Sequence, residues 1–302
     1  MGHNHDHDHG DLKRKKLAFS ILLNILLTIT QVIGGLVSGS LSLLSDALHN
    51  FSDVIALIIS YIADKLSRKE FTLEQTFGYK RAEIIAALIN AASLIAIALL
   101  LAKEAIIRFN EPVEIESYLV IILAAFSIIV NGGSVLLLKK DSEENMNMRS
   151  AYLHLFSDML TSVAVLVGGI GMYYMQIFWI DSVLSIVIAI YLVYSSFGLL
   201  VKPLRVLLHF VPAHLDLMAI KDAIIQIPSI ENIHHIHIWQ LNDKEVHFEA
   251  HIDLKEDLNL SRVCEITGQI RHLLKNEFHI QHTVIQPEFG VADAKHLVVD
   301  ER

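Results

Sequence analysis

Leu48-His49-Asn50-Phe51-Ser52-Asp53 recurs later in the chain as Leu153-His154-Leu155-Phe156-Ser157-Asp158, each time inside a stretch typical of a membrane-spanning helix. Positions four residues apart lie on one face of a helix, so each copy places an imidazole beside a carboxylate. Two such helices packed together offer two nitrogens and two oxygens, a complete tetrahedral ligand set for an ion such as zinc. The repeat therefore predicts a metal site made of His49, Asp53, His154 and Asp158.

A purely structural role is the main alternative, because polar side chains also serve helix packing in membranes. A carboxylate at the centre of a lone membrane helix costs about 3 kcal/mol on insertion scales, and this chain places two there together with two histidines. The first copy also lies in a wider polar stripe, in which Asp46, His49, Asn50 and Asp53 follow i, i+3, i+4, i+7 spacing. Repetition and stripe together favour a role in carrying an ion.

The composition is that of a membrane protein. The chain has 302 residues, of which 53% are hydrophobic, a share too high for an ordinary soluble domain. Six apolar segments are each long enough to span a hydrocarbon layer of about 30 Å. They cover residues 17–37, 41–63, 82–109, 117–138, 151–172 and 180–201. We therefore predict a multi-pass α-helical membrane protein with a six-helix transmembrane domain over residues 13–204.

The charges predict an orientation and exclude some partners. Basic residues precede the first segment, lie in the second and fourth connections and follow the sixth segment, whereas the opposite connections carry almost none. By the positive-inside rule, both termini are cytoplasmic. The formal net charge of −9 argues against a nucleic-acid partner. The single cysteine, Cys264, excludes an internal disulfide and fits a reducing cytoplasm, and we expect no signal peptide.

Residues 1–12 are rich in histidine, with His3, His5, His7 and His9 at every second position. This composition cannot build a core, so we expect a disordered tail that binds metal loosely. An expression tag is the alternative, although tags are usually uninterrupted histidine runs.

After Pro203 the sequence changes to that of a soluble domain, predicted over residues 205–290 and followed by a loose tail over 291–302. The pattern predicts a helix over 215–227, strands over 232–241 and 245–254, a helix over 260–278 and a strand over 281–286. This αββαβ order indicates a small ferredoxin-like α+β domain with its helices on one face of the sheet. In the second strand we expect a buried face of Val246, Phe248, Ala250 and Ile252. The other face, His247, Glu249, His251 and Asp253, is either a ligand row or merely a solvated face.

Other polar and small residues in the apolar segments have structural interpretations. We expect Asn24, Gln31, Asn90 and Asn131 to form interhelical hydrogen bonds, with the lining of a water-filled cavity as the alternative. We expect Gly34-Gly35 and Gly168-Gly169 to let helices approach closely. Asp181 opens the sixth segment, where a carboxylate favours the positive end of the helix dipole, so we interpret it as a cap rather than a metal ligand.

With these features assembled, the chain resembles the cation diffusion facilitator family, in its zinc-type subgroup, over about residues 13–290. The resemblance rests on Ser42-Leu43-Leu44-Ser45-Asp46-Ala47-Leu48-His49 with Asp53, on Phe77-Gly78-Tyr79-Lys80-Arg81-Ala82-Glu83, on residues 147–158 and on His235-Ile236-His237-Ile238-Trp239. It implies a homodimeric exporter that exchanges a divalent cation for protons by alternating access. It makes His49, Asp53, His154 and Asp158 the transport site. It also aligns His234, His251 and Glu288 with the family's cytoplasmic regulatory metal site.

Three departures from the family pattern stand out. The connection over residues 66–79 contains no histidine or aspartate, so we expect the extra loop site of some bacterial relatives to be absent. His209 lies near the place where relatives carry an acidic partner for the basic residue at Arg81, which puts that ion pair in doubt. Cys264 falls where some relatives carry a further histidine ligand.

Zn²⁺ is the expected substrate and regulatory ligand, with Cd²⁺ or Co²⁺ as further candidates, because two imidazoles and two carboxylates suit these ions. Protons can drive release, since they compete with the ion for the imidazoles. A metalloenzyme is disfavoured because the chain lacks HExxH. A membrane-anchored metal sensor without transport is the stronger alternative, because nine of the 17 histidines lie between His234 and His296. We expect an integral protein of a bacterial inner membrane.

Overall fold

The computed structural model describes residues 6–142, 146–292 and 294–298. The fold divides into two compact units. The first contains residues up to Tyr61 together with Ile89–Leu200, and the second contains Ile62–Leu88 together with residues from Val201 onward. The second unit therefore includes a segment, residues 62–88, that lies within the predicted transmembrane domain 13–204.

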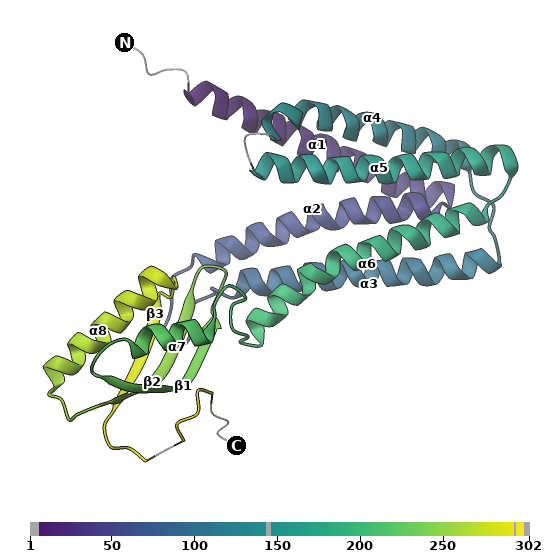
Figure 1. Ribbon diagram of the computed structural model, residues 1–302. Helices are drawn as coiled ribbons and strands as arrows, with labels where there is room; N and C mark the ends of the chain where they lie inside the picture. Colours follow the sequence, from purple (N-terminus) through teal and green to yellow (C-terminus); the bar gives the residue numbers. More distant parts are fainter. Residues whose placement is uncertain (1–5, 143–145, 293, 299–302) are drawn as a thin grey trace, which may run out of the picture. The chain divides into compact units, whose positions relative to one another are not determined.

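The described chain contains six helices that are long and apolar enough to cross a membrane, as predicted (Figure 1). They are α1 (Asp6–Ser38), α2 (Leu41–Ser67), α3 (Ala82–Asn110), α4 (Ser117–Ser142), α5 (Met146–Met175) and α6 (Trp179–Leu207). Many large apolar side chains on them are exposed in the isolated chain, for example Leu36, Ile129 and Tyr194. That surface is suited to contact with lipid.

Helix α1 begins at Asp6 and so extends into the segment 1–12, for which the sequence predicts a disordered tail. Residues 1–5 of that tail, with His3 and His5, lie outside the described residues. The loose binding of metal by the segment 1–12 stays a prediction.

Close helix contacts occur where the sequence places glycine. A Cβ atom at Gly35 would lie 3.1 Å from the backbone of Leu44, so glycine allows α1 and α2 to meet directly below their short connection. A Cβ atom at Gly169 would lie 3.2 Å from the Ile121 side chain, at the contact between α5 and α4. Helices α4 and α5 run side by side, and α1 packs against α4 (Figure 1).

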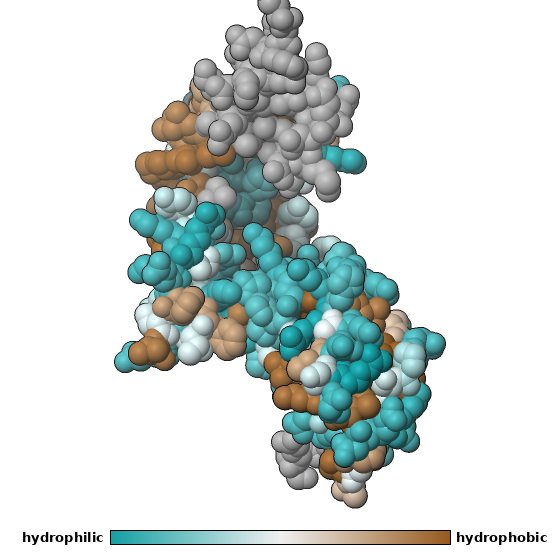
Figure 2. Space-filling model, turned by 90° about the vertical axis from the view of Figure 1, so that its left-hand side faces the viewer, coloured by the Kyte–Doolittle hydropathy of each residue, from teal (hydrophilic) through white to brown (hydrophobic). Residues whose placement is uncertain are grey.

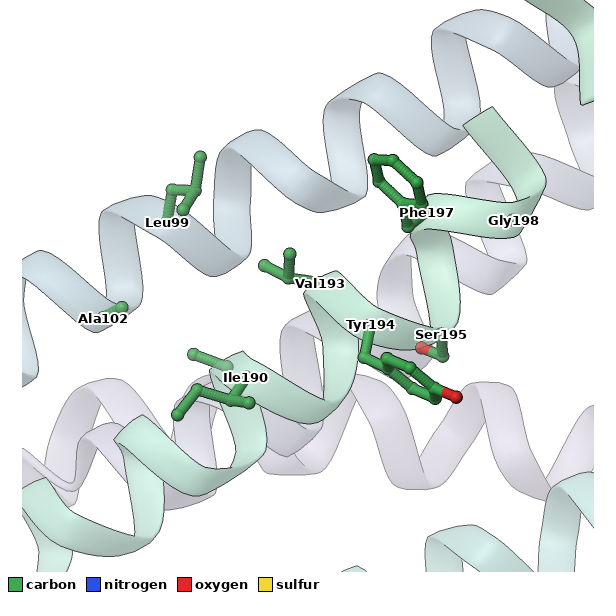
Figure 3. Close-up of a pocket in the computed structure, with 9 residues that line it drawn as sticks. Leu99, Ala102, Ile190, Val193, Tyr194, Ser195, Phe197 and Gly198 are labelled. Carbon is green, nitrogen blue, oxygen red and sulfur yellow. The ribbon is translucent and has the colours of Figure 1, made fainter. Parts of the chain in front are cut away.

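Helices α3 and α6 border an apolar cavity of about 770 Å³ (Figure 3). Leu99, Ile190, Val193 and Phe197 supply much of its wall, and Tyr194 and Ser195 supply its hydroxyls. Its lining contains no histidine or carboxylate, so this cavity offers no strong ligand for a metal cation.

The second unit contains the predicted αββαβ domain. Its elements are α7 (Leu217–Ile225), β1 (Ile230–Gln240), β2 (Val246–Leu254), α8 (Leu260–Glu277) and β3 (His282–Glu288). The sheet order is β1-β2-β3, with β1 antiparallel and β3 parallel to β2. The domain surface turned to the viewer in Figure 2 is mostly hydrophilic, with scattered hydrophobic residues.

The hydrophobic pattern explains this fold. In β2 the side chains of Val246, Phe248, Ala250 and Ile252 are all buried, as predicted. Helix α8 buries Ile266, Ile270 and Leu274, spaced four residues apart on one face, and α7 buries Ile220 and Ile224. These residues form one core between the helices and the sheet. The helices begin at capping side chains: Asp216 accepts from the Met218 N–H, and Asn259 from the Arg262 N–H.

Strand β1 is irregular in a way that simple alternation does not predict. Its pairing with β2 shifts between Ile230 and Asn232 and again between His234 and His237, where His235 has a φ of 52°. The two shifts allow isoleucines at 230, 233, 236 and 238 all to be buried, although their spacing does not fit a period of two. They also bury His234 completely.

The tail after β3 differs from the predicted loose segment 291–302 in its described part. The N–H groups of His235 and Ile236, beside the second shift, donate to the carbonyls of His296 and Leu297 at 3.2 and 2.8 Å. At this irregular stretch of β1 the tail therefore supplies backbone acceptors to two N–H groups of the strand.

Candidate metal sites

The first cluster lies within the membrane-spanning helices and contains the four residues of the repeated motif. Helix α2 supplies His49 and Asp53, and α5 supplies His154 and Asp158. His154 Nε2 lies 3.5 Å from Asp53 Oδ2 and 3.6 Å from Asp158 Oδ2, and His49 Nε2 lies 3.7 Å from Asp53 Oδ2. Ligand atoms of His49, His154 and Asp158 all lie within 4.8 Å of one another. The structure thus brings together all four predicted residues.

These separations suit a small cation. Ligands held about 2.0–2.1 Å from a tetrahedral zinc ion lie about 3.4 Å from each other. Within the described residues, His49 Nδ1, Asp53 Oδ2 and Asp158 Oδ2 are buried atoms without a hydrogen-bond partner. Unsatisfied buried polar atoms are costly, and a bound cation would give the two carboxylate oxygens a partner.

Asp46, in the same polar stripe, has a different role. Its Oδ2 accepts a hydrogen bond from Gln31 Nε2 at 2.8 Å, and Ser162 Oγ lies 3.5 Å from the same oxygen. Asn50 Nδ2 in turn donates to Gln31 Oε1. This network ties α1, α2 and α5 together beside the cluster. Gln31 thus forms the interhelical hydrogen bonds that the sequence predicts. Asn131 instead donates a hydrogen bond to Ser127 of its own helix.

Asp181 caps helix α2, and not only the helix α6 to which it belongs. Its carboxylate accepts from the backbone N–H groups of Leu41 at 2.7 Å and Ser42 at 3.2 Å, and from the hydroxyls of Ser40 and Ser42. The prediction of a cap on α6 missed this contact because it joins positions about 140 residues apart in sequence. The start of α2, the helix that carries His49, is therefore anchored to α6.

The second cluster lies on the sheet of the second unit, with one residue from each strand. His251 Nδ1 lies 2.9 Å from Glu288 Oε1, and His234 Nε2 lies 3.5 Å from Glu288 Oε2. The ligand atoms of His234, His251 and Glu288 lie within 4.8 Å of one another. The pairing of His234 with His251 across β1 and β2 produces this arrangement.

Two further residues, Asp253 and Lys295, approach this second cluster. Asp253 Oδ2 lies 3.3 Å from His234 Nδ1. Lys295, from the tail after β3, places its Nζ 2.7 Å from Asp253 Oδ1 and 3.3 Å from Glu288 Oε2. The alternation of β2 places Asp253 in the row that is either a ligand row or a solvated face, but nothing in the sequence links Lys295 to the cluster.

The outer row of β2 contributes to the second cluster at one end. His251 and Asp253 lie in that cluster, while Glu249 is exposed. His247 stacks between Trp239 and His282, with centroid distances of 5.3 and 4.6 Å. Burial lowers the pKa of His247, and the neighbouring His282 lowers it further against the opposing effect of Glu245.

The departures from the family pattern also have structural outcomes. Arg81 Nη2 lies 2.6 Å from His209 Nε2. A hydrogen bond between a guanidinium group and an imidazole therefore takes the place of the ion pair with a carboxylate that relatives carry. His209 adopts a φ of 57°. Cys264 is a free, exposed thiol on α8.

Comparison with known proteins identifies the family. The model of the cation efflux transmembrane domain matches residues 17–208, and that of the cation efflux protein cytoplasmic domain matches residues 212–289. The metal cation efflux system protein CzcD of Cupriavidus metallidurans is 32% identical, over 96% of this chain and 90% of its own. The zinc transporter ZitB of Pectobacterium atrosepticum is 35% identical, over 98% and 92%. The cadmium, cobalt and zinc/H(+)-K(+) antiporter of Bacillus velezensis is 35% identical, over 95% and 92%.

Both family models match in the expected order, and the relatives align over nearly their whole length. The chain therefore belongs to the cation diffusion facilitator family of metal cation efflux transporters, as a zinc-type, multi-pass membrane protein.

Proposed function

We propose that this protein exports Zn²⁺ from the cytoplasm in exchange for protons, by alternating access and as a homodimer. The observation that carries the proposal is the cluster of His49, Asp53, His154 and Asp158 on two membrane-spanning helices. The relatives' names support the chemistry, since one is a zinc transporter and another an antiporter that takes protons. None of these names describes an enzyme.

The donor set explains selection of the ion. Two imidazole nitrogens and two carboxylate oxygens suit zinc, and they also accept cadmium or cobalt, whereas an all-oxygen site would favour magnesium or manganese. Two carboxylates balance the charge of a divalent ion, which lowers the cost of holding it in a medium of low dielectric constant.

Protonation of the ligands lowers the affinity of the site for zinc on the side where the ion is released. A histidine binds metal only as the neutral imidazole, and it titrates near pH 6.5 when unperturbed. A proton that enters on the far side competes with the ion for His49 or His154. Binding of the ion from the cytoplasm then displaces protons, and the two cargoes exchange through one set of ligands.

The cytoplasmic domain has a regulatory role in this proposal. His234, His251 and Glu288, with Asp253 beside them, hold a zinc ion that stabilises the homodimer. The proposal places the transmembrane domain at residues 13–204 and the cytoplasmic domain at residues 205–290. Both termini lie in the cytoplasm, and the membrane is a bacterial inner membrane.

The test is zinc transport into proteoliposomes with an acidic lumen. Wild-type protein accumulates zinc, and Asp158→Ala abolishes accumulation because the cluster loses a buried carboxylate. Thr161→Val, one turn away on α5, is the matched control, since its hydroxyl bonds only the backbone of its own helix. Zinc binding without flux in the wild type would instead support a membrane-anchored sensor. Full flux in Asp158→Ala would contradict the assigned transport site.

A further inference from the structure

A third group of potential ligands lies on the cytoplasmic sheet, away from both clusters described above. His247 in β2 and His282 in β3 are direct partners in the parallel pair, and their rings stack at 4.6 Å with an interplanar angle of 15°. Glu245 directly precedes β2, and its Oε2 lies 3.7 Å from His282 Nε2. One ligand atom from each residue lies within 4.8 Å of the others. We name Glu245, His247 and His282 the strand-end cluster.

One nitrogen atom of this cluster, His247 Nε2, has no partner that ring packing supplies. The His247 ring stacks on Trp239 and meets the edge of Phe77 at a centroid distance of 5.7 Å. These contacts occupy its faces, but its Nε2 is shielded from solvent and has no hydrogen-bond partner within the described residues. A buried ring nitrogen without a partner is costly, which indicates that this nitrogen binds something else.

A cation already lies beside the carboxylate of the cluster. Lys80 Nζ is 2.7 Å from Glu245 Oε2, the same oxygen that approaches His282. Lys80 belongs to the connection between α2 and α3, so this ion pair links that connection to the sheet within one compact unit. A metal ion bound to the same oxygen would repel the ammonium group and displace it.

We propose that Glu245, His247 and His282 form a third metal site, for zinc or a similar divalent cation, whose occupation releases Lys80 from the sheet. Two imidazoles and one carboxylate are a common ligand set for zinc, with water as the fourth ligand. The ligand atoms must approach by roughly 1 Å to reach tetrahedral spacing. His282 can make this movement because its side chain is 53% exposed.

This site is separate from the second cluster. His247 and His251 lie four residues apart on β2, a distance of about 13 Å along a strand, so one ion cannot bind both. The proposal does not depend on transport, since a chain that moved no zinc would still bind it here.

The test is the zinc stoichiometry of the full-length protein in nanodiscs, measured by equilibrium dialysis. The background carries Asp158→Ala and His251→Ala, to remove the other two clusters, and asparagine in place of His3, His5, His7 and His9. This protein retains one zinc ion per chain, and adding His282→Ala removes it. The matched control is His272→Ala, an exposed histidine on α8 outside the clusters. Equal stoichiometry in the His282→Ala and His272→Ala proteins would overturn the site, as would a background protein that binds no zinc.

Two more variants test the ligands and the competition with Lys80. His247→Phe keeps a ring between Trp239 and His282 but removes the nitrogen, so the protein remains folded and loses the zinc ion. Lys80→Gln removes the competing cation. Given the strength of a partly exposed ion pair of this kind, the dissociation constant for zinc should fall about two- to five-fold. An unchanged constant in Lys80→Gln would overturn the release of Lys80, and retained zinc in His247→Phe would overturn the ligand set.

Discussion

Asp181→Ala should destabilise the transmembrane unit, because it removes the anchor of α2 on α6. The variant leaves the N–H groups of Leu41 and Ser42 without their acceptor, together with two serine hydroxyls. An N-cap is worth about 0.5–2 kcal/mol, and each unsatisfied buried donor costs about 1–3 kcal/mol. Part of this cost is recovered, because the hydroxyls of Ser40 and Ser42 can turn to other acceptors. We expect a net loss of about 3 kcal/mol.

The assay is thermal unfolding of the purified protein in detergent, with Asp181→Asn and Thr161→Val measured beside it. Asp181→Asn keeps one acceptor oxygen and should lose about half as much stability. Asp181→Ala should lower the midpoint by several degrees, at roughly 2–4 °C per kcal/mol for a unit of this size. A midpoint within about 1 °C of the wild type would refute the anchoring of α2 by Asp181.

The remaining predictions concern both units. Lys295→Gln removes the ammonium group beside Asp253 and Glu288, so zinc titrations should show roughly five-fold tighter binding at the second cluster, equivalent to about 1 kcal/mol; weaker binding would show that Lys295 supports the site. Gly35→Leu must separate α1 from α2, and it should reduce the yield of folded protein in size-exclusion chromatography, whereas Gly133→Ala, with open space around it, should not. Glu288→Gln should weaken zinc binding at the second cluster without abolishing transport in liposomes.

The sequence predicts the architecture because hydrophobic patterns are local. Each membrane-spanning helix is a long apolar run, and β2 alternates without interruption, so the six helices and the αββαβ order agree with the structure. The repeated motif also predicts its own geometry. In each copy the histidine and the aspartate lie one helical turn apart, and only the approach of His154 on α5 to Asp53 on α2 depends on the fold.

The features that escaped prediction depend on distant segments or irregular backbone. Asp181 caps a helix far away in sequence, and Lys295 reaches the second cluster from a tail that looked unstructured. The shifts in β1 break the period of two, so alternation alone could not show that His234 is buried. The strand-end cluster depends on the register of β2 and β3, which the sequence does not specify for a parallel pair.

The central claim is that zinc and protons exchange through the ligands of the intramembrane cluster. The most direct measurement follows zinc and pH together inside proteoliposomes, with dyes for both in the lumen, after zinc is added outside. The account predicts that zinc entry is accompanied by a rise in luminal pH, that an ionophore that dissipates the proton gradient stops accumulation, and that Asp158→Ala shows neither signal. Zinc entry without any change in luminal pH, or unchanged entry in Asp158→Ala, would contradict it.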